Sequence, residues 1–236
     1  MVNNSRNKTT NTKIIISNDN NYSELEIIPK NEVILNRKSW IDYLKESGLW
    51  PLIRQRPFSK IADPESTPKS IFISLHDTRP YGCNTELAIS SNKDLFNKGL
   101  KLLSKISNCP INIGVGLGFD LELISIGNQR SCNIHTIEGP HPSGNVGVQI
   151  HHIDPIVSKD DIRWYVDVNS LIDLGYFFEN KTYNPYKIIS VCGIISNSIH
   201  RKVVKHQLIE NLFFDEEMDS QKQRINFKKI SRMSSR

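Results

Sequence analysis

Cysteine is scarce in this 236-residue sequence, and its four cysteines are widely separated. Cys83, Cys109, Cys132 and Cys192 form no Cys-x-x-Cys pair. Zinc ribbons and iron–sulfur clusters need such closely spaced thiolates, so the sequence supports neither. Nothing suggests export, and we therefore expect four buried, reduced thiols in a cytoplasmic protein rather than a disulfide framework.

Long apolar runs are absent as well. No window approaches eighteen consecutive apolar residues, so we expect no membrane-spanning segment. The N-terminus also lacks an apolar core of signal-peptide length after its basic residues. If such a protein works at a membrane, it does so by docking on something else. The net charge is +5, but aromatic residues do not alternate with Lys and Arg across a face, which disfavours a nucleic-acid-binding module.

Core-forming residues are rare at both ends of the chain. Residues 1–30 read as a flexible polar arm, because their Asn, Ser, Thr and Lys cannot bury enough apolar surface to offset the entropy of ordering. Residues 211–236 read as a basic tail, in which positions 221–236 hold six basic residues and no acidic one. Such a tail could touch an anionic membrane or nucleic acid, but a solvated tail is the simpler interpretation.

Between these ends, residues 31–210 alternate strand and helix patterns. We expect helices at 39–46, 93–107 and 170–178, and strands at 70–75, 110–115, 130–137, 164–168 and 187–192. Strand–helix–strand order of this kind favours a layered α/β domain. The strand at 70–75 ends in His76, Asp77, Thr78 and Arg79, and ligands collect at this carboxyl edge of open α/β sheets.

Three glycines follow the strand expected at 110–115, in the order Gly114, Gly116 and Gly118. Their Gly-x-Gly-x-Gly spacing falls short of the Gly-x-Gly-x-x-Gly dinucleotide fingerprint. We interpret them as residues that let a strand turn into the next element, with a nucleotide loop as the alternative.

A segment rich in Gly, Pro and His spans residues 138–155. With His135, its histidines at 141, 151 and 152 could ligate a metal, but no Glu-x-x-His pair accompanies them, and loop shaping is the simpler role. Ser143 near His141 and Asp154 superficially suggests a nucleophile, base and acid. Because the turn of a nucleophilic serine is missing, we reject a hydrolase.

Residues 48–60 (GLWPLIRQRPFSK) read as a structured loop interrupted by two prolines. Its basic residues Arg54, Arg56 and Lys60 flank Phe58. Cations beside an aromatic ring can hold an anionic or planar ligand. A solvated loop, or a loop held against a partner subunit, fits the composition equally well.

Three stretches resemble the A-subunit family of the sodium-translocating NADH:quinone oxidoreductase. They are SGLWPLIRQRPFSK with IFISLHDTRP (47–60 and 71–80), EGPHPSGNVGVQIHHIDPI (138–156), and WYVDVNSLIDLGYFFENKTYNPYKIISVCG (164–193). Their order and spacing match the family over roughly residues 40–205. The usual β-rich N-terminal domain is replaced here by the polar arm, and the likeness fades after about residue 204.

The resemblance implies a Rossmann-like α/β fold related to the flavoprotein subunit of complex I, with flexible termini. In that relative a glycine-rich loop holds FMN. Arg56, Pro57 and Phe58 replace the glycines here, which implies a flavin fold that has lost its flavin, since bulky side chains keep the backbone away from a phosphate. The chain would then bind no redox cofactor, while FMN, FAD and iron centres belong to other subunits.

The resemblance also implies where a protein of this family acts. We expect a soluble accessory subunit on the cytoplasmic side, held at the inner membrane through partner subunits, above all a membrane-embedded one. It would contribute to assembly and contact ubiquinone, without independent catalysis. The candidate quinone or partner contacts are Arg54, Arg56, Phe58, Ser59, Lys60, His141 and Pro142. The alternative is a stand-alone binding module, or a degenerate copy that no longer joins a pump.

Overall fold

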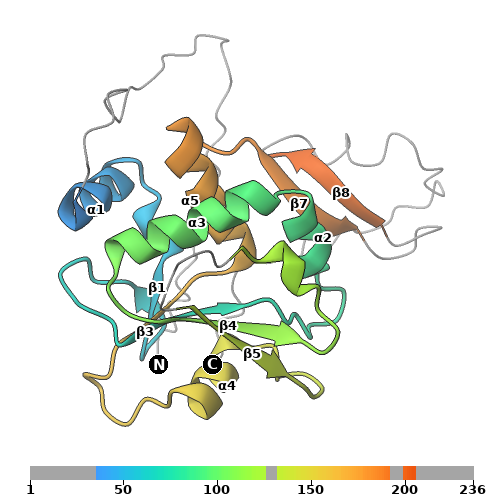
Figure 1. Ribbon diagram of the computed structural model, residues 1–236, viewed down its shortest axis with the longest axis horizontal. Coiled ribbons are helices and arrows are strands. Elements are labelled where there is room, and N and C mark those ends of the chain that lie inside the picture. The colour runs from blue at the N-terminus through green and yellow to red at the C-terminus, as the bar shows by residue number, and fades with distance from the viewer. Residues whose placement is uncertain (1–35, 126–131, 192–198, 206–236) are drawn as a thin grey trace, which may run out of the picture.

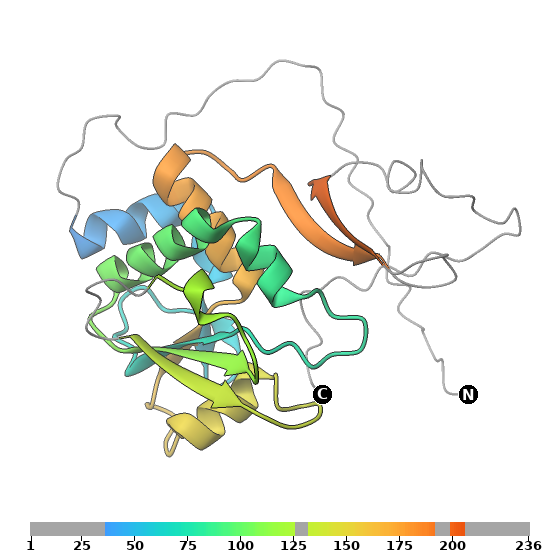
Figure 2. The ribbon, with the colours of Figure 1, turned by 45° about the vertical axis from the view of Figure 1, so that its right-hand side comes forward.

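The computed structural model describes residues 36–125, 132–191 and 199–205 (Figures 1 and 2). The polar arm predicted at 1–30 and the basic tail predicted at 211–236 lie outside these ranges, as does Cys192. Within them the chain forms an α/β fold with a six-stranded mixed sheet and a separate two-stranded sheet. The predicted fold class is therefore confirmed at this level.

The larger sheet has the strand order β2-β1-β6-β3-β4-β5. Its strands are β1 (Arg54–Arg56), β2 (Lys60–Ile61), β3 (Ser70–Ser74), β4 (Ile111–Gly116), β5 (Cys132–Ile137) and β6 (Arg163–Tyr165). The last four are parallel, whereas β1 runs antiparallel to both β6 and β2. The smaller sheet pairs β7 (Tyr186–Val191) with β8 (Ile199–Val204) in antiparallel register.

The chain reverses its direction of travel across the sheet beside β3. It moves from β3 to β4 and β5 on one side, then returns to place β6 on the other side of β3. At such a switch point the loops after the two neighbouring strands separate, and a ligand site can form at their carboxyl ends. The loop after β3 begins at Leu75, and the loop after β6 begins at Val166.

Helices cover the two faces of the sheet unequally. Figure 1 shows α1 (Arg37–Glu46), α2 (Thr85–Ser90), α3 (Lys93–Ile106) and α5 (Val168–Asn180) on one side, and α4 (Val146–Ile153) on the other. Two short 3₁₀ turns, η1 (Trp50–Leu52) and η2 (Leu121–Leu123), complete the described elements. In this part of the chain no helix is long and apolar enough to cross a membrane.

The close packing of α3 against α5 depends on two glycines. A Cβ atom at Gly99 would lie less than 3.0 Å from the carbonyl oxygen of Leu171, and one at Gly175 would lie less than 3.0 Å from that of Leu95. Around them, buried side chains such as Phe96, Leu103 and Phe177 pack against the sheet. The two helix backbones therefore touch, and this contact anchors the main core.

Three elements differ from the sequence prediction. The loop expected at 48–60 contains η1 and the β1–β2 hairpin, because the edge of the sheet supplies hydrogen-bonding partners that local sequence does not reveal. The loop expected at 138–155 holds α4, whose short length and Gly147 weaken any helical pattern. Helix α2, capped by Asn84, was not predicted at all.

The described cysteines are free thiols: Cys83 and Cys109 are buried and Cys132 is partly buried. Burial raises the pKa of the Cys132 thiol to about 11, and it also raises the pKa of Cys83 and Cys109. Because only the thiolate alkylates, we expect native Cys132 to react with iodoacetamide at about pH 8 roughly a hundredfold more slowly than an ordinary thiol. Peptide mapping after timed labelling, with a sample in denaturant as control, measures this ratio. Equal labelling rates in the two samples would contradict it.

Candidate functional site

The segments singled out from the sequence meet where α4 begins. The loop after β3, the Gly-Pro-His-Pro loop before α4, and the β1–β2 hairpin all contact this region. It lies at the carboxyl end of β3, on the face of the sheet that α4 covers (Figure 2). The structure therefore joins segments that lie up to about ninety residues apart in sequence.

The loop after β3 and the loop before α4 are joined by direct hydrogen bonds. The Gly144 amide donates to the Thr78 hydroxyl (3.1 Å), and the Ser74 hydroxyl donates to the Gly144 carbonyl (2.9 Å). A Cβ at Gly144 would collide with the backbone of His76 and Thr78. Only glycine allows this approach, so Gly144 fixes how the two loops sit together.

The His141 side chain is part of the same contact. Its Nδ1 atom lies 3.1 Å from the Thr78 hydroxyl oxygen. His141 and Pro142 are both exposed, and the peptide bond between them is cis. The predicted residues of this loop are thus at the surface, with His141 held on one side by Thr78.

The turn of the β1–β2 hairpin is strained and points an aromatic ring outward. Phe58 and Ser59 have φ angles of 70° and 51°, a left-handed region that is unusual for a bulky side chain. The Phe58 side chain is 80% exposed. Arg54 donates to the Ser59 carbonyl, and the Ser59 hydroxyl lies 2.5 Å from the Tyr165 hydroxyl. These bonds stabilise the turn, and an exposed ring held under strain is typical of a contact site.

Arg56 connects this hairpin to α4. Its guanidinium carbon lies 5.5 Å from the centre of the Tyr165 ring, in cation–π geometry. A Cβ built at Gly147, in the first turn of α4, would lie 3.5 Å from Arg56 Nη2. Lys60 is exposed and belongs to the short strand β2. Arg54 and Arg56 therefore have structural contacts, whereas Phe58 and Lys60 are available to a ligand or partner.

A charge pair lies beside Thr78. Arg79 donates to both carboxylate oxygens of Asp77, at 2.8 and 2.5 Å. Burial tends to raise the pKa of the Asp77 carboxyl, but the hydrogen bonds and charge of Arg79, with a smaller effect of His141, hold that pKa below its usual value. Asp77 therefore stays ionised, with Arg79 rather than His141 as its hydrogen-bonding partner.

The Gly114 and Gly116 positions accommodate protein side chains. A Cβ at Gly114 would meet the amide of Gln149, and a Cβ at Gly116 would lie 2.7 Å from His76 Nδ1. Gln149, 1% exposed, donates from Nε2 to the Ser74 hydroxyl at 2.8 Å. The two glycines lie within β4 and make room for these side chains, whereas Gly118, with a φ angle of 80°, is the one of the three that lies in the turn after the strand.

The histidine cluster does not converge. His135 Nε2 lies 3.0 Å from Asn112 Oδ1, whereas His151 and His152 are exposed neighbours on α4. Among the described residues, no group of three His, Cys, Asp or Glu side chains could hold a metal ion. Ser143 donates to the Gly139 carbonyl and Asp154 pairs with Arg163, so the serine has a structural role.

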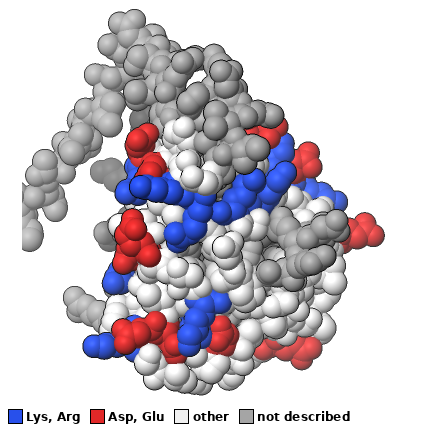
Figure 3. Space-filling model, turned by 60° about the vertical axis from the view of Figure 1, so that its left-hand side comes forward, with Lys and Arg blue, Asp and Glu red and all other residues white. Residues whose placement is uncertain are grey.

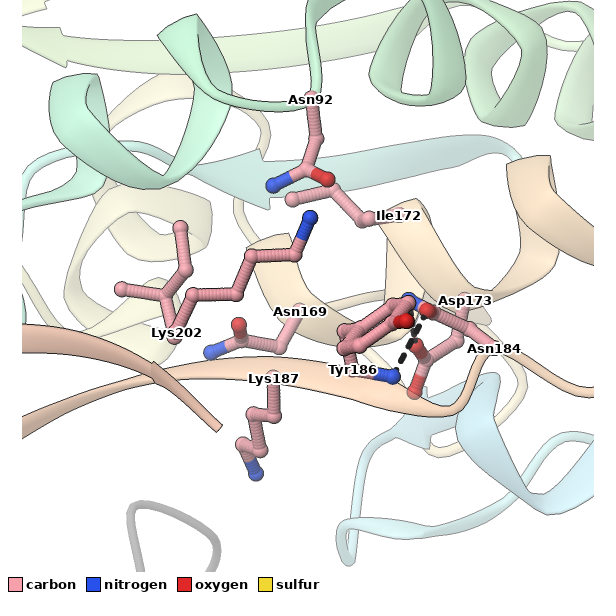
Figure 4. A pocket seen from close by; sticks show the side chains of 9 residues that line it. Asn92, Asn169, Ile172, Asp173, Asn184, Tyr186, Lys187 and Lys202 are labelled. Atoms are coloured by element: carbon pink, nitrogen blue, oxygen red, sulfur yellow. Dashed lines mark hydrogen bonds between the residues drawn. The ribbon is translucent and has the colours of Figure 1, made fainter. Parts of the chain in front are cut away.

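Two cavities in the described part of the chain lie elsewhere. One, of about 10 Å³, opens between α5 and the β7–β8 hairpin (Figure 4), and its volume suits no more than a single water. In that view Lys202 extends toward Asn92, while Lys187 points away. The other, of about 500 Å³, is a groove lined by apolar residues such as Leu49 and Val204 and by the charged pair Asp173 and Lys205. Neither is lined by the predicted site residues, so the candidate site is a surface of converging loops.

Basic side chains form a band across one face (Figure 3). The helices on the α1 side of the molecule carry exposed Lys45 and Lys105 in their last turns. Cations at helix carboxyl ends are stabilised by the macrodipole. These two exposed lysines are thus accounted for by helix ends without any ligand.

The comparison with protein families decides the identity of the chain. The family described as "NqrA second alpha/beta domain" matches residues 35–183, which is more than half of the sequence. The chain belongs to this family. All the converging loops of the candidate site fall inside the matched range.

Relatives of this NqrA-domain chain are named as the A subunit of the Na(+)-translocating NADH-quinone reductase. The protein of Alcanivorax borkumensis is 33% identical over 159 residues, covering 67% of this chain and 35% of that protein. The Rhodopirellula baltica protein is 30% identical over 186 residues, covering 76% and 40%. The Shewanella amazonensis protein is 32% identical over 169 residues, covering 72% and 35%. The chain thus spans little more than a third of the length of these relatives.

Several residues of the NqrA-domain site were not predicted as contacts. Thr78, Ser74, Gly144, Tyr165 and Gln149 hold the loops together. The sequence does place Thr78 at the carboxyl edge of a buried strand, where ligands collect, but it does not indicate its contact with His141. Tyr165 and Gln149 gave no signal, because their contacts depend on the order of strands in the sheet.

Proposed function

We propose that this chain is a soluble accessory domain of a sodium-translocating NADH:quinone reductase that contributes to assembly and contacts quinone, without a redox cofactor of its own. The enzyme is inferred from the names of the relatives, which are A subunits of the Na(+)-translocating NADH-quinone reductase. The observation that carries the proposal is Phe58, which is exposed and has a strained backbone at the tip of the β1–β2 hairpin. The same hairpin contacts the start of α4. Partner subunits, one embedded in the membrane, would hold the domain at the cytoplasmic side of the inner membrane.

A quinone head group is a flat ring with two carbonyl acceptors. Phe58 offers a ring face for stacking, and Lys60 and His141 offer hydrogen-bond donors. All three side chains are exposed. The same features suit a loop that docks on a neighbouring protein of the complex, so quinone and partner contact are two parts of one proposed surface.

The second part of the proposal is that the chain has a Rossmann-like fold related to the flavoprotein subunit of complex I and has lost the flavin. Three features of the hairpin turn support the loss. Pro57 has no N–H to donate, Phe58 carries a bulky side chain, and the Ser59 carbonyl accepts from Arg54. A phosphate cradle needs closely approaching backbone N–H groups, which glycine permits and these residues obstruct. Flavin absorbance in the purified protein would overturn this part.

The quinone contact is tested by removing the exposed side chains. We expect Phe58→Ala together with Lys60→Ala to weaken binding of a short-tailed ubiquinone analogue about tenfold, because a stacking contact and a donor are both lost. Titration of intrinsic fluorescence or calorimetry measures the affinity. Tyr186→Ala is the matched control, since Tyr186 is an exposed aromatic on the separate β7–β8 sheet. An unchanged affinity in the double variant would remove the site assignment.

The partner contact is tested by co-purification. Tagged chain co-expressed with the membrane subunits of the reductase should be recovered with them, and the Phe58 and Lys60 variant should be recovered less. A chain that stays alone when those subunits are present would favour a stand-alone module instead.

A further inference from the structure

Thr78 has a hydrogen-bonding arrangement that favours one of the two neutral tautomers of His141. A threonine hydroxyl has one proton to donate and lone pairs to accept. The Gly144 amide donates to Thr78 Oγ1 at 3.1 Å, and His141 Nδ1 lies 3.1 Å from the same oxygen. One lone pair is engaged by the amide, and among the described residues His141 Nδ1 is the only acceptor within reach of the hydroxyl proton, so this arrangement favours donation from Thr78 to Nδ1.

We infer that Thr78 is a positioning residue that holds His141 as the Nε2–H tautomer, with that N–H presented as the donor to a quinone carbonyl. This inference rests on the quinone-binding function proposed above. Nδ1 of a neutral imidazole that accepts the Thr78 hydroxyl proton has none of its own, so the ring proton is on Nε2. His141 is exposed, and within the described part of the chain Nε2 has no hydrogen-bonding partner.

The loops are built to keep this geometry. Gly144 allows the backbone of its loop to touch residues 76–78, and the bond from Ser74 fixes the Gly144 carbonyl. Asp77, the nearest carboxylate in the loop, is bonded to Arg79. A neutral hydroxyl, not a carboxylate, is therefore the hydrogen-bonding partner of the imidazole, and it orients the ring without placing a full negative charge on it.

The tautomer is measured directly and without any quinone. Long-range ¹H–¹⁵N NMR of the full chain at about pH 8.5, where an ordinary imidazole is neutral, distinguishes the two tautomers. His141→Gln identifies the signal among the seven histidines. We expect the Nε2–H form alone in the natural sequence and in Thr78→Ser, and a mixture of both forms in Thr78→Val. A proton on Nδ1 in the natural sequence, or a spectrum unchanged in Thr78→Val, would overturn the inference.

The affinity for a short-tailed ubiquinone analogue supplies the second arm. Thr78→Val should weaken binding about threefold to tenfold, the range of one hydrogen bond, and Thr78→Ser should restore it. In a His141→Ala background, Thr78→Val should have no further effect. A further loss in that background would show that Thr78 acts through folding and would refute the positioning role.

The two arms separate two kinds of failure. If the tautomer depends on Thr78 but the natural sequence binds no analogue, the proposed function fails and the link to quinone with it, while the Thr78–His141 arrangement stands. If the analogue binds but the His141 tautomer is the same in Thr78→Val as in the natural sequence, the inference fails and the proposed function survives.

Discussion

Replacing Gly175 by alanine should destabilise the domain by about 3 kcal/mol, although alanine is the better helix former. The added Cβ would lie less than 3.0 Å from the Leu95 carbonyl oxygen and the Gly99 amide nitrogen. Both atoms belong to the backbone of α3, so no side chain can rotate away. Overpacking a core costs about 1–3 kcal/mol and sometimes more, which outweighs the gain of about 1 kcal/mol in helix propensity. For a chain of this length the midpoint of thermal unfolding should fall by roughly 6–12 °C.

The matched control is Gly147→Ala in α4. There the nearest atom to the new Cβ is Arg56 Nη2 at 3.5 Å, an ordinary contact, and no left-handed φ is present. We expect unchanged or slightly higher stability by chemical denaturation, because alanine loses less backbone entropy in a helix. If both variants unfolded at the same denaturant concentration, the backbone contact between α3 and α5 would not be a determinant of stability.

The sequence was informative where side chains themselves repeat with the period of an element. The helix at Lys93–Ile106 and the strand at Ser70–Ser74 follow from apolar periodicity, and they agree with prediction within a residue or two. The hairpin of β1 and β2 could not be predicted in this way. Its strands are three and two residues long, and β1 depends on pairing with β6, more than a hundred residues away.

The candidate site was predicted in part for a related reason. Phe58 and His141 were found from local composition and from resemblance, and the structure places both at the surface. Their supports come from distant segments: Tyr165 contacts the Phe58 turn, and Thr78 contacts His141. The first contact requires the return of the chain to β6, and the second requires the loop before α4 to lie against the loop after β3; no local pattern contains either fact.

Removing the Asp154 carboxylate should be the other strongly destabilising change. Arg163 is only 2% exposed and donates from Nη2 to Asp154 Oδ1 at 2.6 Å, while the Ser70 hydroxyl donates to Oδ2 at 2.6 Å. Asp154→Ala leaves a buried guanidinium without its counter-charge. Breaking a buried pair costs about 3–5 kcal/mol. We expect about 3 kcal/mol by urea unfolding, because the Asp154 side chain is 35% exposed and water can reach the gap.

Two further variants separate loss of the pair from loss of packing. Replacing both partners, Asp154→Leu with Arg163→Met, should recover much of the stability, because no buried charge is then left alone. Glu179→Ala breaks the exposed Lys98–Glu179 pair and should change the unfolding midpoint little. If the double replacement were as unstable as Asp154→Ala, the isolated charge would not be the cause.

The pH dependence supplies an independent check on the Asp154 pair. Burial tends to raise the pKa of the Asp154 carboxyl, but the hydrogen bonds from Arg163 and Ser70 hold that pKa below its ordinary value of 3.8. A carboxyl with a lowered folded-state pKa contributes stability above its unfolded pKa and loses it as the pH falls through the folded one. The stability advantage of the natural sequence over Asp154→Ala should therefore be constant from about pH 7 to 5 and shrink below about pH 4. An advantage that stayed constant into that acidic range would show that the Asp154 charge does not stabilise Arg163.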